Sequence, residues 1–211
     1  MPDVPPSVRF RTFLILGAPG SGKGTQGKVL GSIPRFHHLA CGDVFRSLDT
    51  RTLLGQKFVE YSSRGELVPD DVTVQLWNAN VKQRVDSHMF KPEIDFLVLD
   101  GIPRNVEQAR FMESHIEVLK VFHLSCPDRT ELARRLRKRA LKDNRFDDAN
   151  ETVIQNRFAT YEAETKPILD YYAGDRIVDI DASQPPAKVL YDILAGVMTL
   201  DAWKEQEKMK I

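Results

Sequence analysis

A glycine-rich segment near the start of the chain has the residue types that bind phosphate groups. Residues 17–25, GAPGSGKGT, directly follow the apolar residues 13–16, FLIL. The spacing fits the phosphate-loop pattern G-x-x-x-x-G-K, in which backbone N–H groups surround a phosphate chain and the lysine adds a positive charge. A helix that begins near Gly24 would point the positive end of its dipole at the same place. The segment therefore predicts a nucleotide phosphate site at the end of a buried strand.

The last position of this pattern departs from the usual one. It carries Gly24 in place of serine or threonine, and the hydroxyl comes one residue later, at Thr25. The structural alternative is a glycine-rich turn that only joins a strand to a helix. Because an apolar strand precedes the segment and a helix-compatible stretch, residues 26–33, follows it, the context favours the phosphate site.

An acidic residue ends another apolar run. Asp100 and Gly101 follow residues 96–99, FLVL. A carboxylate at the end of a buried strand, beside a phosphate loop, is placed to hold magnesium directly or through water. Asp100 taken alone also fits an aspartate that caps a turn before glycine.

Arginines recur on two predicted helices in the second half of the chain. Asp128 can cap the first of these helices, with Glu131 as the partner in a capping-box-like pair. A basic helix face is usually just solvated, but arginines on adjacent helices can converge on phosphates, which guanidinium groups bind well. The four candidates are Arg135, Arg139, Arg145 and Arg157.

Two acidic residues lie between these helices. Asp147 and Asp148 come two and three residues after Arg145. Either they cap the helix that begins near residue 150, or they hold the arginines in position. We expect neither of them to be catalytic.

Short apolar runs alternate with longer helical patterns along the chain. Besides residues 12–16, the predicted strands are Phe36–Ala40, Asp95–Leu99, Lys120–Ser125 and Arg176–Ile180. This alternation is typical of a parallel sheet covered by helices on both faces, which binds ligands at the carboxyl ends of its strands. Between Arg46 and Val81 no strand pattern occurs, so we expect a flap of two or three short helices, one of which begins near residue 70.

The composition is that of an ordinary globular protein with one domain. The 211 residues include 30 basic and 30 acidic side chains, and this balance gives no reason to expect binding to nucleic acid or to a membrane surface. No apolar stretch reaches the length of a membrane span, and the N-terminus lacks a signal-peptide pattern. Two scattered cysteines and five histidines without metal spacing predict no disulfide framework and no zinc site, so the expected location is a reducing cytoplasm.

Together, these segments resemble the nucleoside monophosphate kinases, and the short-lid adenylate kinases in particular. The resemblance covers residues 12–195 and rests on Gly17 to Gln26, Gly42-Asp43 with Arg46, Asp100-Gly101 and Pro103-Arg104 with Gln108, and Arg145 and Asp147-Asp148 with Arg157. It implies a three-layer α/β P-loop fold with a five-stranded parallel sheet. The core would comprise residues 9–41, 81–135 and 150–199, the helical monophosphate-binding flap about residues 42–71, and the lid about residues 139–148.

The resemblance also implies a reaction and a set of site residues. The reaction is the reversible transfer of a phosphoryl group from MgATP to AMP, which gives two ADP, by a monomer whose partners are ATP and AMP. The implied catalytic residues are Lys23, Arg104, Arg135, Arg139, Arg145 and Arg157. ATP would bind at Gly17, Gly20, Ser21, Gly22, Lys23, Gly24, Thr25, Arg135, Arg139 and Gln184. The monophosphate would bind at Cys41, Gly42, Arg46, Leu67, Val68, Gly101, Arg104, Gln108, Arg145 and Arg157, and magnesium would be oriented through water by Asp43 and Asp100.

Three departures from the family pattern bear on these expectations. Only residues 140–144 separate Arg139 from Arg145, which implies the short type of lid and no structural zinc. Cys41 stands where adenylate kinases usually carry threonine and pyrimidine-monophosphate kinases alanine, and Ile102 replaces the customary phenylalanine. The last two positions touch the pocket for the acceptor base and not the reacting phosphates.

Three other functions remain open from the sequence. A UMP/CMP kinase performs the same reaction on another base, and Asn105 resembles that group, whereas Gln108-Ala109 resembles the adenylate kinases. A nucleotide-dependent switch protein is a second alternative, against which stand Gly24, the arginine set and the lack of an Asn-Lys-x-Asp motif. The third is an inactive kinase-like binding protein, although every expected charged position is filled.

Overall fold

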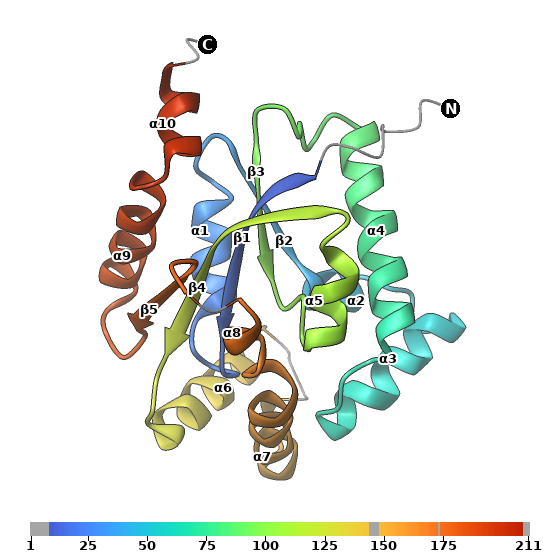
Figure 1. Ribbon diagram of the computed structural model, residues 1–211. Coiled ribbons are helices and arrows are strands. Elements are labelled where there is room, and N and C mark those ends of the chain that lie inside the picture. Colours follow the sequence, from blue (N-terminus) through green and yellow to red (C-terminus); the bar gives the residue numbers. More distant parts are fainter. Residues whose placement is uncertain (1–8, 144–147, 173, 209–211) are drawn as a thin grey trace.

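Five parallel strands form one sheet at the centre of the protein, in the order β2-β3-β1-β4-β5 (Figure 1). The computed structural model describes residues 9–143, 148–172 and 174–208. The strands are β1 (Phe10–Gly17), β2 (Phe36–Ala40), β3 (Phe96–Asp100), β4 (Ile116–Ser125) and β5 (Ile177–Asp181). All five predicted strands and the α/β fold class are confirmed, and β1 and β4 begin earlier than their apolar runs indicated.

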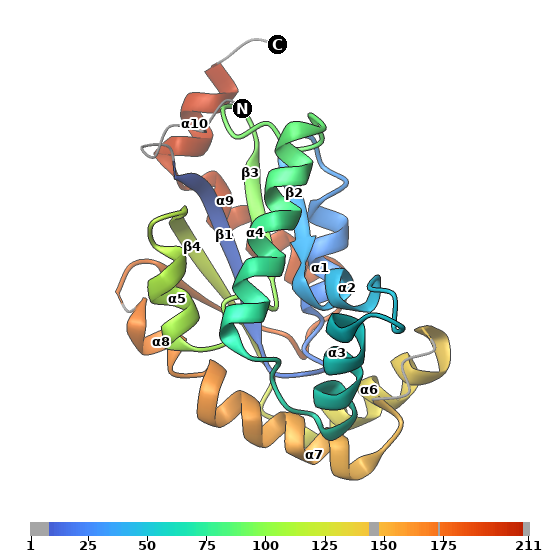
Figure 2. The same ribbon diagram turned by 90° about the vertical axis from the view of Figure 1, so that its right-hand side faces the viewer.

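Helices cover both faces of this sheet, as Figures 1 and 2 show. Their bounds are α1 (Lys23–Leu30), α2 (Cys41–Arg46), α3 (Leu53–Arg64), α4 (Asp70–Asp86), α5 (Val106–Met112), α6 (Arg129–Asp143), α7 (Glu151–Thr160), the π-helical turn η2 (Tyr161–Thr165), α8 (Ile168–Tyr171), α9 (Pro186–Met198) and α10 (Asp201–Lys208). Buried side chains of α1, α6, α7 and α9 form the core on one face, and those of α2, α4, α5 and α8 form it on the other. In the described ranges, no helix is long and apolar enough to cross a membrane.

The carboxyl ends of three neighbouring strands meet at one edge of the sheet. Ile15 on β1 and Ala40 on β2 both lie opposite Asp100 on β3. From this edge, β1 continues through the glycine-rich turn into α1, β2 continues directly into α2, and β3 leads to the loop before α5. The parallel topology therefore brings the predicted phosphate loop, Gly42 and Asp100 together, although they are far apart in the sequence.

The interval without strand signals is helical, as predicted. Thr52 caps α3, because its Oγ1 accepts a hydrogen bond from Gly55 N at 3.1 Å. Gly65 ends this helix in the left-handed conformation, with φ 74°. The next helix, α4, begins at Asp70 as expected but has 17 residues, so the expectation of short helices is wrong for this one. It extends far beyond the predicted flap because buried residues such as Trp77 continue its apolar face into the core.

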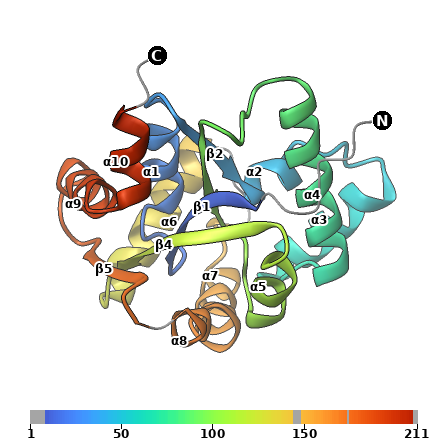
Figure 3. The same cartoon turned by 45° about the horizontal axis from the view of Figure 1, so that its top comes forward.

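The last helix, α10, packs at the amino end of the sheet (Figure 3). The ring of Trp203 on α10 stacks on Phe36 and Phe96, with ring centroids 5.4 and 6.0 Å apart. Trp203 thereby joins the last helix to β2 and β3. The charged helix α10 continues to the last described residue, and its aromatic residue is a packing contact.

We expect Gly55→Ala to destabilise the protein, although alanine is the better helix former. A Cβ atom at this position would lie 2.2 Å from the carbonyl oxygen of Asp49, which is backbone and cannot simply rotate away. Helix propensity would gain about 1 kcal/mol, whereas overpacking costs about 1–3 kcal/mol and a contact this short belongs at the upper end. The free energy of unfolding, measured in urea, should fall by about 2 kcal/mol. Lys57→Ala, on the exposed side of the same helix, is the control and should not be less stable; a Gly55→Ala variant more stable than wild type would contradict the prediction.

Candidate active site

The turn between β1 and α1 has a backbone conformation that glycine adopts more readily than other residues. Gly17, Gly20 and Gly22 have φ angles of 148°, 85° and 98°. A Cβ atom on Gly20 would lie 2.7 Å from the carbonyl oxygen of Leu132 on α6, so the turn is packed tightly against that helix. The hydroxyl of Ser21 is buried and has no hydrogen-bond partner within the described ranges. A phosphate oxygen at this helix N-terminus would satisfy such a group.

Lys23 folds back over this turn. Its Nζ donates hydrogen bonds to Gly17 O at 2.7 Å and to Ala18 O at 3.1 Å. Burial lowers the pKa of Lys23 to about 8; Asp100 opposes the shift, while Arg139, Arg104 and Arg157 add to it. Lys23 therefore lies within electrostatic range of one aspartate and three arginines. Of the four arginines that the sequence suggested would converge, Arg139 and Arg157 belong to this group, and Arg145 lies outside the described residues.

Asp100 lies at the end of β3, directly beside the first turn of α1. A Cβ atom on Gly24 would lie 3.4 Å from Asp100 Oδ2, so a longer side chain pointing that way would press on the carboxylate. The glycine in place of the usual serine or threonine thus leaves room around Asp100. Burial lowers the pKa of His38, and Asp100 and Asp43 oppose this shift, which indicates that both carboxylates lie near the same side chain.

The arrangement fits magnesium held mainly through water and phosphates. Among the described residues, no group of three or more His, Cys, Asp and Glu side chains could hold a metal ion on its own. Magnesium with a nucleotide needs only one or two carboxylates, since waters and phosphate oxygens supply its other ligands. Asp100 is mostly buried at the strand end, and Asp43 is tied to Arg46 Nη2 at 2.7 Å. Both are oxygen donors of the kind that magnesium prefers.

The contacts of Asp148 distinguish between the two roles that the sequence leaves open for it. Its side chain is fully buried, Oδ2 lies 2.6 Å from Arg139 Nη2, and Oδ1 accepts a hydrogen bond from Arg157 Nη1. The helix that follows is capped by another residue, Asn150, whose Oδ1 accepts hydrogen bonds from the N–H groups of residues 152 and 153. Asp148 therefore holds two arginines from two helices in one place. Its predicted neighbours, Arg145 and Asp147, lie outside the described residues.

Arg135 joins α6 to the loop after β5. Its Nη1 donates to Ala182 O at 2.8 Å, and its Nε donates to Glu131 at 2.8 Å. Gln184 lies in the same loop and donates to Asp181 O at 3.0 Å. Arg135 and Gln184 thus both bond to the backbone of residues 181–182 at the end of β5. Capping of α6 by Asp128 is confirmed, since Asp128 Oδ1 accepts from the N–H groups of residues 130 and 131, while Glu131 pairs with arginines instead.

Arg104 is fixed through its backbone as well as its side chain. Its Nε donates to Gly101 O at 2.9 Å, and its carbonyl oxygen accepts from Thr165 Oγ1 at 2.8 Å. Its N–H group donates to Gln108 Oε1 at 2.8 Å. Thr165, on the π-helical turn η2, was not predicted as a site residue, because a lone threonine in a helical stretch carries no sequence signal of this contact.

Gln108 is almost completely buried, with 1% of its surface exposed. Besides accepting from Arg104 N, its amide donates from Nε2 to Asp70 Oδ1 at 2.6 Å. Asp70 also accepts two hydrogen bonds from Asn105 Nδ2. The sequence marked Asp70 only as an acidic residue in the first turn of α4, and nothing in the chain indicated that it meets two amides from α5 and its cap.

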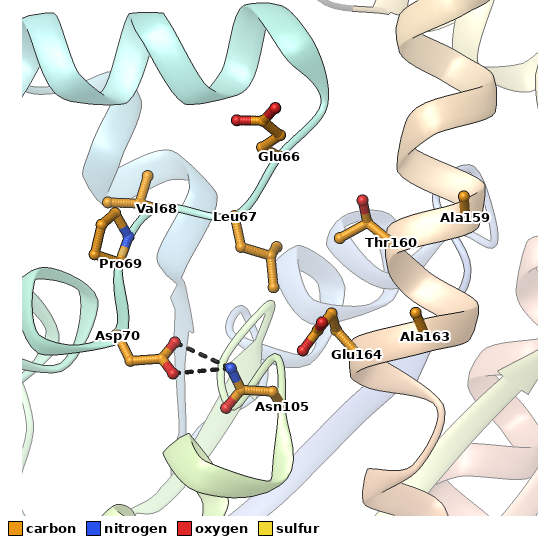
Figure 4. A pocket seen from close by; sticks show the side chains of 10 residues that line it. All are labelled: Glu66, Leu67, Val68, Pro69, Asp70, Asn105, Ala159, Thr160, Ala163 and Glu164. Atoms are coloured by element: carbon orange, nitrogen blue, oxygen red, sulfur yellow. Dashed lines mark hydrogen bonds between the residues drawn. The ribbon is translucent and has the colours of Figure 1, made fainter.

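A cavity of about 500 Å³ lies between the end of the predicted flap and α7 (Figure 4). Leu67 and Val68, predicted to contact the monophosphate, line it together with Asp70, Asn105 and Thr160. Cys41, Ile102 and Gln108 are nearly or fully buried. Burial raises the pKa of the Cys41 thiol to about 11, so it stays protonated at neutral pH.

The comparison with known proteins agrees with this geometry. A family model described as adenylate kinase matches residues 15–177. The chain belongs to the adenylate kinase family. An adenylate kinase of Cyanothece sp. is 37% identical over 188 residues, which cover 86% of this chain and 92% of that protein. Adenylate kinases of Thermobifida fusca (37% over 182 residues, 83% of this chain and 92% of that one) and Chlamydia muridarum (33% over 216 residues, 86% and 85%) are similar in the same way.

The lowered pKa of Lys23 predicts how the stability of this member of the adenylate kinase family depends on pH. The group binds its proton less well in the folded chain, at a pKa of about 8, than at its ordinary value of 10.5. Between these two pKa values Lys23 holds its proton in the unfolded chain but has largely lost it in the folded chain. The contribution of this residue to the free energy of unfolding therefore rises with pH. Compared with Lys23→Met, the wild type should gain unfolding free energy between pH 8 and 10, measured by urea titration. Lys28→Met, exposed on the same helix, is the control, and a difference that is flat or falls with pH would contradict burial as the cause of the shift.

Proposed function

We propose that this protein transfers the γ-phosphoryl group of MgATP reversibly to AMP, giving two ADP. The observation that carries the proposal is that Lys23, in the phosphate loop after β1, lies within electrostatic range of Asp100 at the end of β3 and of Arg104, Arg139 and Arg157. Phosphoryl transfer requires positioning and neutralisation of charge more than a protein nucleophile, and a site of this kind provides both. The adenylate kinases in the comparison point to the same reaction.

On this proposal, ATP and AMP occupy opposite sides of the lysine. The glycine-rich turn and Lys23 bind the phosphates of ATP, and Arg135 on α6 and Gln184 in the loop after β5 also contact ATP. Arg46 and Arg104 bind the phosphate of AMP. Magnesium supplies positive charge to the β- and γ-phosphates, and Asp43 and Asp100 orient it through water.

The arginines that Asp148 holds neutralise the group in transit. In the described structure Arg139 and Arg157 are paired with this buried carboxylate, so they are already oriented before phosphates arrive. Arg145, from the predicted lid of about residues 139–148, joins them when the lid closes. Closure also excludes water, which would otherwise accept the phosphoryl group.

The acceptor in this proposal is AMP and not a pyrimidine monophosphate. Asn105, which resembles the UMP/CMP kinases, has both ends of its amide in use: Oδ1 accepts from Gln108 N and Nδ2 donates to Asp70. These contacts give Asn105 a structural role as the cap of α5 and a partner of Asp70, and the adenylate kinases in the comparison support AMP as the acceptor. We further propose a monomer acting in the cytoplasm on ATP and AMP as its only partners, in keeping with its net charge of zero.

We expect Lys23→Met and Arg139→Ala each to reduce kcat by about 10²–10³, since one preorganised charge contact typically contributes this much. The assay is ADP formation from ATP and AMP with magnesium, and EDTA should abolish it. Lys28→Met and Arg137→Ala are matched controls, because each changes an exposed cation on the same helix as its counterpart. Near-normal rates in both site variants would refute the roles of these residues, and a wild type that only hydrolyses ATP would refute the kinase function.

We also expect kcat/KM to be higher for AMP than for CMP or UMP, and this preference to shrink in Gln108→Ala. An unsatisfied buried polar group costs about 1–3 kcal/mol, so a base that leaves the Gln108 amide unpaired should be rejected. Glu107→Ala, exposed and adjacent, is the control and should keep the wild-type order of acceptors. A wild type that prefers CMP or UMP would assign the protein to the alternative acceptor class.

A further inference from the structure

One carboxylate connects the end of the predicted flap to the loop that carries Arg104. Asp70 opens α4, and it accepts hydrogen bonds from Asn105 Nδ2 at 3.1 and 2.9 Å and from Gln108 Nε2 at 2.6 Å. Figure 4 shows Asp70 and Asn105 facing one another at the edge of the cavity. Asp70 is therefore in contact with the cavity on one side and with the buried Gln108 on the other.

These contacts leave the Gln108 amide only one favourable orientation. The N–H group of Arg104 can only donate, so it requires Gln108 Oε1 on its side. The ionised carboxylate of Asp70 can only accept, so it requires Gln108 Nε2 on the other side. Turning the amide over would place N–H against N–H at Arg104 and oxygen against oxygen at Asp70.

We propose that Asp70 is a positioning residue that makes the acceptor site choose a 6-aminopurine over a 6-oxopurine. The proposal rests on the proposed function, in which the base of AMP meets Gln108. With its two contacts made, Gln108 has one hydrogen left on Nε2 and one lone pair left on Oε1. This pair matches an amino group beside a ring nitrogen that accepts, as in adenine, and opposes an oxo group beside a ring N–H, as in hypoxanthine.

Burial makes this orientation matter for selectivity. Gln108 has 1% of its surface exposed, so water cannot compensate a mismatched amide. If Gln108 were free to turn over, it could pair with either base, and the site would not distinguish them. The Arg104 N–H group and the Asp70 carboxylate prevent the amide from turning over. Of these two partners, only Asp70 contributes a side chain and can be changed by substitution without altering the backbone.

The test compares AMP with IMP as acceptors in wild type, Asp70→Asn and Asp71→Asn. An asparagine at position 70 can turn its own NH2 group toward Gln108 and so stabilise the reversed amide. The ratio of kcat/KM for AMP to that for IMP should therefore fall about tenfold in Asp70→Asn, with the KM for ATP unchanged. Asp71→Asn removes the same charge from the same first helical turn, but the residue is exposed, so its ratio should stay at the wild-type value.

A structural role alone would lower activity toward both acceptors equally and leave their ratio unchanged. An unchanged ratio in folded Asp70→Asn, or an equal fall in Asp71→Asn, would overturn the proposal. If Asp70→Asn does not fold, Asp70→Ser supplies the same measurement, because its hydroxyl is too short to hold the amide. A wild type that phosphorylates neither acceptor would overturn the proposed function as well. If the wild type phosphorylates AMP but Asp70→Asn leaves the ratio of kcat/KM for AMP to that for IMP unchanged, only this proposal is overturned.

Discussion

The repulsion among positive charges at the carboxyl edge of the sheet is the constraint on which the site depends. Arg104, Arg139 and Arg157 all lie close enough to Lys23 to lower its pKa, in addition to the larger effect of burial. Two carboxylates offset this repulsion from different directions. Asp100 belongs to the sheet, and Asp148 lies between the helices that carry the arginines.

This charge repulsion explains why so many helices, strands and loops contribute residues to one small region. A cluster of like charges is unfavourable without its anionic ligand, so the surrounding structure has to hold it in place. The parallel sheet fixes Asp100, the glycine-rich turn fixes Lys23 through two carbonyl oxygens, and the Gly101 and Gln108 contacts fix Arg104. The bound phosphates complete the charge balance, which links binding to the stability of the site.

The sequence was sufficient for the features that depend on local pattern. The strands were found from apolar runs, and the phosphate loop from the spacing of its glycines and lysine. The role of Asp148 could not be decided in that way, because an aspartate before a helix caps it or pairs with arginines with equal ease. The Asp70–Gln108 contact was missed for another reason: it joins residues 38 positions apart, and neither residue type nor spacing marks such a pair. The length of α4 was also missed, because its buried residues face a core that only the tertiary fold defines.

The two tryptophans lie in different parts of the molecule. Trp77 is buried on α4, the helix that begins at Asp70, whereas Trp203 stacks on aromatic rings near the amino ends of β2 and β3. The intrinsic fluorescence of the chain therefore combines two signals of separate origin. With Trp203 replaced by phenylalanine, all remaining indole emission comes from α4, so that changes in the packing of this helix become visible optically without an attached dye.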